Sequence, residues 1–198
     1  MKSSPYTSTR VGLLVWATML TGMAHAAPQA IQVLNLDGKP VPLAVVPVMV
    51  KGATVNGAGV VADMGQRERR FAPTVVAIPV GGSVNFPNFD TVRHHVYSFS
   101  NTRKFEIKLY TGTPTAPVVF DKAGTATLGC NIHDTMVGYV HVVDTPYYGV
   151  TDTNGKVSID LPAGEHKARI WTPAMGESVV PTEAMLKTGG SVTFKVKG

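Results

Sequence analysis

Cysteine is nearly absent from this sequence, because its 198 residues contain only Cys130. A single cysteine excludes an internal disulfide framework. Basic residues are also not gathered into long runs: Arg67, Arg69 and Arg70 form the densest group, and Glu68 lies among them. Because nucleic-acid-binding domains cluster Lys and Arg on one face, this pattern argues against nucleic acid as a partner. We interpret the arginine group as a solvated strand edge.

Long apolar runs are missing as well, since residues 11–20 reach only about half of the roughly 20 residues that a membrane-spanning helix needs. Lys2 and Arg10 precede this run, and the small residues of Ala24-His25-Ala26 follow it, which is typical of a signal peptide. We therefore predict cleavage after Ala26, export to the periplasm and no membrane span in the mature chain; the alternative is a membrane anchor. Loss of Lys2 and Arg10 leaves 16 of the 18 basic residues against 13 acidic ones, a net charge near +3.

Helical periodicity is absent after residue 27, where residues 181–187 form only a weak candidate for a short helix. Short segments rich in Val, Ile, Thr, Tyr and Phe lie instead between 20 glycines and 14 prolines that are spread along the chain. The sequence therefore predicts an all-β protein. The expected strands are residues 31–36, 41–50, 74–80, 83–86, 95–100, 105–110, 118–120, 125–128, 138–143, 156–161, 167–171 and 191–196.

The C-terminal part has the turn signals of a small β-module. Asn154-Gly155 favours a two-residue hairpin turn, and Pro162-Ala163-Gly164 favours a second turn, so we predict one β-meander. This part resembles the transthyretin-like and carboxypeptidase-regulatory-like β-sandwich modules, and the stretch IQVLNLDGKPVPLAVVPV, residues 31–48, resembles their opening strands. We therefore predict that residues 27–53 complete a second small β-sandwich with residues 146–198, and that a domain of residues 54–145 is inserted between them. The alternative is one elongated sandwich.

The stretch GCNIHDTM places Cys130, His133 and Met136 at third-residue intervals between two expected strands. A lone cysteine in an exported protein is a buried inert thiol, one half of an intermolecular disulfide, or a metal ligand. Thiolate with imidazole suits zinc or copper, but a thioether is a poor zinc ligand, so Met136 favours copper. Two imidazoles, one thiolate and a long axial thioether form the blue-copper arrangement, of which this loop supplies three donors.

The remaining donor should be a histidine from another strand, and FPNFDTVRHHVYSFS contains the candidates His94 and His95. Here GGSVNFPNFDTVRHHVYSF, followed by FDKAGTATLGCNIHDTMVGYVHVV, resembles the cupredoxins, the plastocyanin, azurin and amicyanin group, over residues 71–143. RHHVYSFS and GCNIHD are also similar to periplasmic proteins labelled methylamine utilisation proteins. The resemblance implies a cupredoxin-like Greek-key β-sandwich with one type 1 copper ion, held by His94, Cys130, His133 and Met136.

His95 remains an alternative ligand. Strand alternation places it on the same face as Tyr97 and Phe99, which have the character of core residues. If His94 is the ligand, His95 is available to hydrogen-bond the ligand loop, where the family usually has Asn. The other histidines of the mature chain lack a suitable neighbour in the sequence and are interpreted as structural: His141 and His166.

The predicted centre favours an electron carrier over an enzyme, because four protein donors leave no obvious open position and the sequence contains no Gly-x-Ser-x-Gly nucleophile motif. The resemblance implies that electrons leave through His133, within an apolar patch to which Ile132, Pro87 and Phe89 contribute. It also implies a transient redox protein partner. The alternative functions are a copper-binding or copper-delivery protein, and an adhesion module with a vestigial site.

Overall fold

The computed structural model describes residues 26–197, in which regular structure is almost entirely β-strand. The predicted signal peptide falls on residues 1–26 and so lies outside the described residues, apart from Ala26. Within residues 26–197, no helix is long and apolar enough to cross a bilayer. The elements are β1 (Ala27–Asn35), β2 (Val45–Met49), β3 (Val61–Asp63), β4 (Gly65–Arg67), β5 (Arg70–Ala72), β6 (Val75–Pro79), β7 (Gly82–Asn85), β8 (His94–Ser98), β9 (Phe105–Tyr110), β10 (Val118–Phe120), β11 (Gly124–Leu128), β12 (Gly138–Val143), β13 (Tyr148–Val150), β14 (Lys156–Leu161), β15 (Glu165–Ile170), the 3-10 helix η1 (Pro173–Met175), β16 (Thr182–Lys187) and β17 (Val192–Val196).

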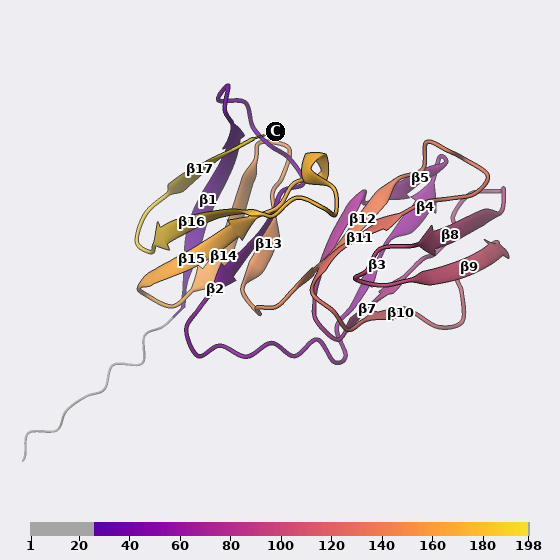
Figure 1. Ribbon diagram of the computed structural model, residues 1–198, viewed down its shortest axis with the longest axis horizontal. Coiled ribbons are helices and arrows are strands. Elements are labelled where there is room, and N and C mark those ends of the chain that lie inside the picture. Colours follow the sequence, from indigo (N-terminus) through magenta and orange to yellow (C-terminus); the bar gives the residue numbers. More distant parts are fainter. Residues whose placement is uncertain (1–25, 198) are drawn as a thin grey trace, which may run out of the picture.

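The first two strands and the last five form one lobe, called here the terminal lobe (Figure 1). It has a three-stranded sheet of order β14-β1-β17 and a four-stranded sheet of order β13-β2-β15-β16. Strand β1 is antiparallel to β14 and parallel to β17, so the start of the described chain lies between two C-terminal strands. Its core includes Val33, Val46 and Ile170. The domain boundaries at residues 53 and 145, and the likeness to transthyretin-like modules, stay predictions.

Strands β3 to β12 form the second lobe, called here the central lobe (Figure 1). Its sheets have the orders β10-β7-β3, β11-β12-β6, β4-β5 and β8-β9. Strand β12 lies between β11 and β6 and is rich in valine, which suits a strand that is buried on both faces. The core of this lobe includes Phe86, Val96 and Phe120, together with Cys130 and Met136.

The predicted C-terminal β-meander is wrong, because β13 pairs with β2 and β14 pairs with β1, and neither pairs with the other. The turn at Asn154-Gly155 carries the chain from one sheet to the other. The Asp152 carboxylate accepts hydrogen bonds from the N–H groups of Asn154 and Lys156, both at 2.8 Å. The carbonyl of Gly155 accepts the N–H of Val33 in β1 at 2.7 Å. The position of the turn was therefore predictable from its own residues, but the pairing partners of β13 and β14 were set by residues far away in the sequence.

The weak helix candidate at residues 181–187 is also wrong. This segment is strand β16, which pairs antiparallel with β15 from Glu165↔Lys187 to Ile170↔Thr182. It lies at the edge of its sheet, where Leu186 is 1% exposed and the adjacent Met185 is 64% exposed. Adjacent side chains on opposite faces are the pattern of a strand with one buried face.

The two lobes share an apolar contact. Val75 and Val143 of the central lobe lie in one buried cluster with Val45 and Trp171 of the terminal lobe. The Trp171 ring also stacks on the ring of His141 from β12, with centroids 4.8 Å apart and an interplanar angle of 21°. The central lobe is therefore packed directly against the sheets of the terminal lobe.

Candidate metal centre

The predicted ligand loop, residues 129–137, connects the antiparallel strands β11 and β12. Its first residue, Gly129, exchanges both backbone hydrogen bonds with Tyr97 of β8, at 3.0 and 3.1 Å. A Cβ at Gly129 would lie 2.6 Å from Cζ of Tyr97, so any other residue here would have to displace the Tyr97 ring. Farther along the loop, the N–H of Met136 donates to the carbonyl of His133 at 2.9 Å and closes a turn. Cys130 and Met136 are both buried.

Strand β8 supplies the upstream histidine. His94, Val96 and Ser98 are 0%, 0% and 1% exposed, so these alternate side chains face the interior. The pairing of β8 with β9 has a register irregularity between His94 and Val96. The expectation that Phe99 belongs to the core is wrong, because its side chain is 78% exposed, and Tyr97 is only half-buried.

The structure brings together His94, Cys130 and His133. The Cys130 Sγ lies 3.9 Å from Nδ1 of His94 and 3.8 Å from Nδ1 of His133, and the two imidazole centroids are 5.0 Å apart. Among the described residues, this is the only group of three or more His, Cys, Asp or Glu side chains whose ligand atoms lie close enough to hold a metal ion.

This donor set fits one copper ion. Three donors in a plane, each at about 2.0–2.3 Å from a metal, lie about 3.5–4 Å from one another, which is the spacing of the thiol from both imidazoles. One thiolate with two imidazoles is also the donor combination of trigonal copper sites. The cluster could therefore hold one copper ion. Met136 belongs to the same buried core as Cys130, and its role as the axial donor stays a prediction.

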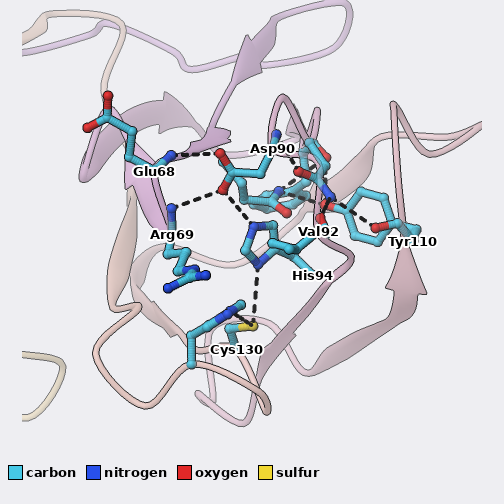
Figure 2. A network of polar contacts seen from close by, with 11 residues as sticks. Glu68, Arg69, Asp90, Val92, His94, Tyr110 and Cys130 are labelled. Carbon is cyan, nitrogen blue, oxygen red and sulfur yellow. Dashed lines mark hydrogen bonds and ion pairs between the residues drawn. The ribbon is translucent and has the colours of Figure 1, made fainter.

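The second ring nitrogen of His94 contacts a carboxylate that sequence reasoning missed. The Nε2 of His94 lies 2.8 Å from Oδ2 of Asp90 (Figure 2). An ionised carboxylate only accepts hydrogen bonds, so Nε2 carries a proton; in the neutral imidazole this leaves the lone pair on Nδ1, the nitrogen nearest the thiol. Metal-binding histidines commonly donate their other N–H to a carboxylate, so an aspartate four residues before His94 was an available signal.

Asp90 is itself fixed by the turn between β4 and β5. Its Oδ1 accepts the N–H of Glu68 at 2.7 Å, and its Oδ2 accepts the N–H of Arg69 at 2.9 Å (Figure 2). Burial by itself would raise the pKa of Asp90, but the hydrogen bonds from Arg69, His94 and Glu68 outweigh it and hold that pKa below its usual value. Asp90 therefore remains ionised at neutral pH.

A buried asparagine holds the segment that carries Asp90 in place. The Asn88 amide donates to the carbonyls of Val92 and Tyr110, at 2.9 and 3.0 Å, and its Oδ1 accepts the N–H of Asp90 at 2.9 Å. The Tyr110 hydroxyl donates to the carbonyl of Phe86 at 2.6 Å, and burial raises the pKa of Tyr110 to about 12. Because Asn88 satisfies three backbone groups at once, the segment before His94 has a fixed conformation.

His95 lies outside the three-residue cluster. Its Nδ1 is 3.0 Å from the side-chain nitrogen of Asn131, which follows Cys130 in the ligand loop. Its Nε2 is 3.0 Å from Oε1 of Glu106 on β9, in ion-pair range but not aligned as a hydrogen bond. His95 thus contacts the ligand loop from the side while His94 faces the thiol.

The other predicted residues have separate positions. His141 lies 2.9 Å from the hydroxyl of Thr125, and His166 lies 2.8 Å from the carbonyl of Pro162, so neither takes part in the cluster. In the predicted apolar patch, Phe89 and Ile132 are 57% and 48% exposed. The expectation for Pro87 is wrong: it is buried, with its carbonyl accepting the N–H of Gln66 in β4.

No protein-family model and no curated protein sequence matches this chain. Solved structures that match part of it include a purple cupredoxin from Nitrosopumilus maritimus, with 23% identity over 42% of this chain and 99% of the other and a TM-score of 0.36. Amicyanin from Paracoccus versutus has 20% identity over 50% of this chain and 97% of the other, with a TM-score of 0.36. A copper-containing nitrite reductase from Thermus scotoductus has 26% identity over 49% of this chain but only 25% of the other, with a TM-score of 0.38. The chain is thus similar to cupredoxins over about half its length, and the function proposed below depends on the arrangement of its own side chains.

Proposed function

We propose that this protein carries single electrons between redox partners by means of one type 1 copper ion. His94, Cys130 and His133 would hold the ion, with Met136 as a weak axial donor. The observation that carries this proposal is the position of two imidazole nitrogens 3.9 and 3.8 Å from one buried thiol. Bound copper supplies the one-electron chemistry by alternating between its Cu(I) and Cu(II) states.

The burial of the donors supports a carrier rather than an enzyme. His94, Cys130 and Met136 are 0%, 4% and 1% exposed, so these donors have little surface that a substrate could contact. His133 is half-buried and is the donor that a partner could approach. The donors are held by β8 and by a short loop with hydrogen-bonded ends, so they can keep their places when the charge at the centre changes.

We propose a periplasmic location, on the signal-peptide pattern of residues 1–26. In that compartment an unpaired thiol is open to oxidation. Burial of Cys130, and the metal proposed to bind it, would protect it.

The visible spectrum of the copper-loaded protein tests the proposal. Charge transfer from the Cys130 thiolate to copper should give an intense blue band, and Cys130→Ser should abolish the band and weaken copper binding, because it removes the only proposed anionic ligand. A blue band that persists in this variant would contradict the site. A reversible one-electron voltammetric wave is expected of a carrier; copper that binds without cycling would favour copper delivery instead.

A matched pair of variants tests the choice between the adjacent histidines. His94→Gly should open a coordination position that added imidazole can fill, with a change in the visible spectrum. His95→Gly should keep the parent spectrum, with or without imidazole, because His95 contacts Asn131 and Glu106 rather than the thiol. The reverse result would make His95 the ligand.

A further inference from the structure

The hairpin of β4 and β5 brings three arginines to the same end of the central lobe as the candidate metal centre. Its two-residue turn, Glu68-Arg69, has φ angles of +54° and +57°, the left-handed conformation of a tight hairpin turn. The backbone N–H groups of this turn are the donors that bind Asp90, and Asp90 binds His94. One side chain therefore separates the hairpin turn from a proposed ligand (Figure 2).

Each arginine also lies against a segment that borders the centre. The Arg67 guanidinium is 4.5 Å from the centroid of the Phe89 ring, a cation–π contact on an aromatic side chain that is 57% exposed. Arg69 lines a hollow with Asp90 and Val92. Arg70 lines another with Thr135 and Val137, at the end of the ligand loop. The hairpin thus borders both the segment before His94 and the loop after His133.

The charges of these arginines are available to a partner. Arg67, Arg69 and Arg70 are all exposed, and within residues 26–197 none of them forms an ion pair with a carboxylate. Glu68 is the one acidic residue of the hairpin. The nearby Asp90 carboxylate binds the backbone of the turn and the ring of His94 instead of a guanidinium group, so the three arginine side chains remain open to solvent.

We propose that Arg67, Arg69 and Arg70 form a docking surface for a redox partner protein that carries a cluster of surface carboxylates near its own redox centre. This inference rests on the electron-transfer function proposed above. Guanidinium groups bind carboxylates through paired hydrogen bonds, and arginine and aromatic residues are enriched at protein interfaces. A positive surface of this kind speeds the encounter with an acidic partner while leaving the complex short-lived.

Stopped-flow electron transfer with two c-type cytochromes, one acidic and one basic, tests this surface on the copper-loaded mature protein. The variant Arg67→Gln/Arg69→Gln/Arg70→Gln is compared with Lys156→Gln/Lys187→Gln/Lys195→Gln, which removes the same charge from exposed positions of the terminal lobe. At low salt the arginine variant should lose about tenfold in second-order rate constant with the acidic cytochrome, and the lysine variant less than about twofold. The wild-type rate with this cytochrome should fall as salt is added, whereas the rate with the basic cytochrome should not.

The outcomes separate the docking surface from the function itself. If the wild type exchanges electrons with neither cytochrome nor with ascorbate, the electron-transfer function is wrong. If it exchanges electrons but the arginine and lysine variants lose the same factor in rate constant with the acidic cytochrome, net charge alone sets the rate and the docking surface is wrong. Binding to phosphatidylglycerol vesicles that only the arginine variant loses, with unchanged electron-transfer rates, would make the hairpin a membrane contact and also overturn the proposal. The visible spectrum of each variant verifies an intact centre, and the single variants Arg67→Gln and Arg70→Gln extend the comparison if the triple variant folds poorly.

Discussion

The ring of His94 is constrained at both of its nitrogens. Nδ1 faces the thiol of Cys130 at 3.9 Å, and Nε2 contacts Asp90 at 2.8 Å. Since the ring is fully buried, neither contact competes with water. The conformation and tautomer of this proposed ligand are therefore set before any metal binds, and the carboxylate adds a negative charge close to the centre.

Asp90→Asn should raise the reduction potential of the copper-loaded protein. The amide keeps an oxygen that can accept a hydrogen bond, but it lacks the charge that stabilises Cu(II) more than Cu(I). A lost differential interaction of about 1.4 kcal/mol corresponds to about 59 mV for a one-electron couple, so a rise of tens of millivolts is expected by voltammetry. Asp121→Asn removes an exposed carboxylate beside Arg103 and serves as the control. Equal potentials for Asp90→Asn and wild type would limit Asp90 to positioning the segment before His94.

Met136→Leu should also raise the reduction potential while the blue colour remains. The substitution keeps the volume of a side chain that is 1% exposed, so packing is preserved, but it removes the weak thioether donor that favours Cu(II). A rise on the order of tens of millivolts to 100 mV is expected by voltammetry at one pH, with copper content measured in parallel. An unchanged or lower potential at full copper loading would show that Met136 only fills the core.

At the scale of elements, the ligand loop is fixed where it joins its neighbours. Gly129 is bonded to Tyr97 of β8 where the loop begins, and Gly138 packs against Phe71 of β5 where β12 begins. The hairpin that contacts Asp90 through its turn thus also supports the far end of the loop. The candidate centre depends on β4, β5, β8 and β12 together.

Gly138→Ala should destabilise the fold by about 1–3 kcal/mol, as is typical when a methyl group is forced into a packed core. The added Cβ would lie 2.9 Å from Cδ2 and 3.0 Å from Cβ of Phe71. Because the Cβ of Phe71 is bonded directly to the backbone of β5, it cannot easily move aside. Urea unfolding measures the loss. Gly190→Ala is the control, since a Cβ at Gly190 meets no atom within 4 Å. Adding Phe71→Leu should restore part of the stability, and no restoration would mean that another contact causes the loss.

At the scale of the whole molecule, the two lobes are joined by buried side chains that include an ionisable group. His141 extends from β12 of the central lobe onto Trp171 of the terminal lobe. Burial, with a further effect from the nearby Arg169, lowers the pKa of His141 from 6.5 to about 4, against a small opposing effect of Asp144. The imidazole is therefore neutral in the folded protein at neutral pH.

Stability should consequently fall as the pH drops from about 6.5 toward 4. Below 6.5 the unfolded chain binds a proton at His141, whereas the folded chain does not until about pH 4, so acid favours the unfolded state. Between pH 7.5 and 5 this group should remove about 2 kcal/mol from the free energy of unfolding. Urea unfolding of wild type and His141→Asn at both pH values tests this. Between pH 7.5 and 5, the free energy of unfolding of the variant should fall by about 2 kcal/mol less than that of wild type. Equal losses would show that His141 is not the group responsible.

The sequence by itself determined the all-β class and placed three candidate metal donors on one loop. Both are local properties: β-branched runs between Gly and Pro predict strands, and the spacing of Cys130, His133 and Met136 lies within one connection. The chemistry of donor atoms, which needs no structure, then favoured copper. The structure places the Cys130 thiol beside the His133 imidazole, as this spacing led us to expect.

Only the tertiary structure decided which residues from elsewhere in the chain meet that loop. It turned His94 rather than His95 toward the thiol, and it placed Asp90 behind that ring. It also set the arginine hairpin beside the centre and sent β13 and β14 to different sheets. The physical reason is common to all of these: a turn or a strand is encoded by its own residues, whereas its partner is chosen by packing and backbone pairing between segments far apart in the chain.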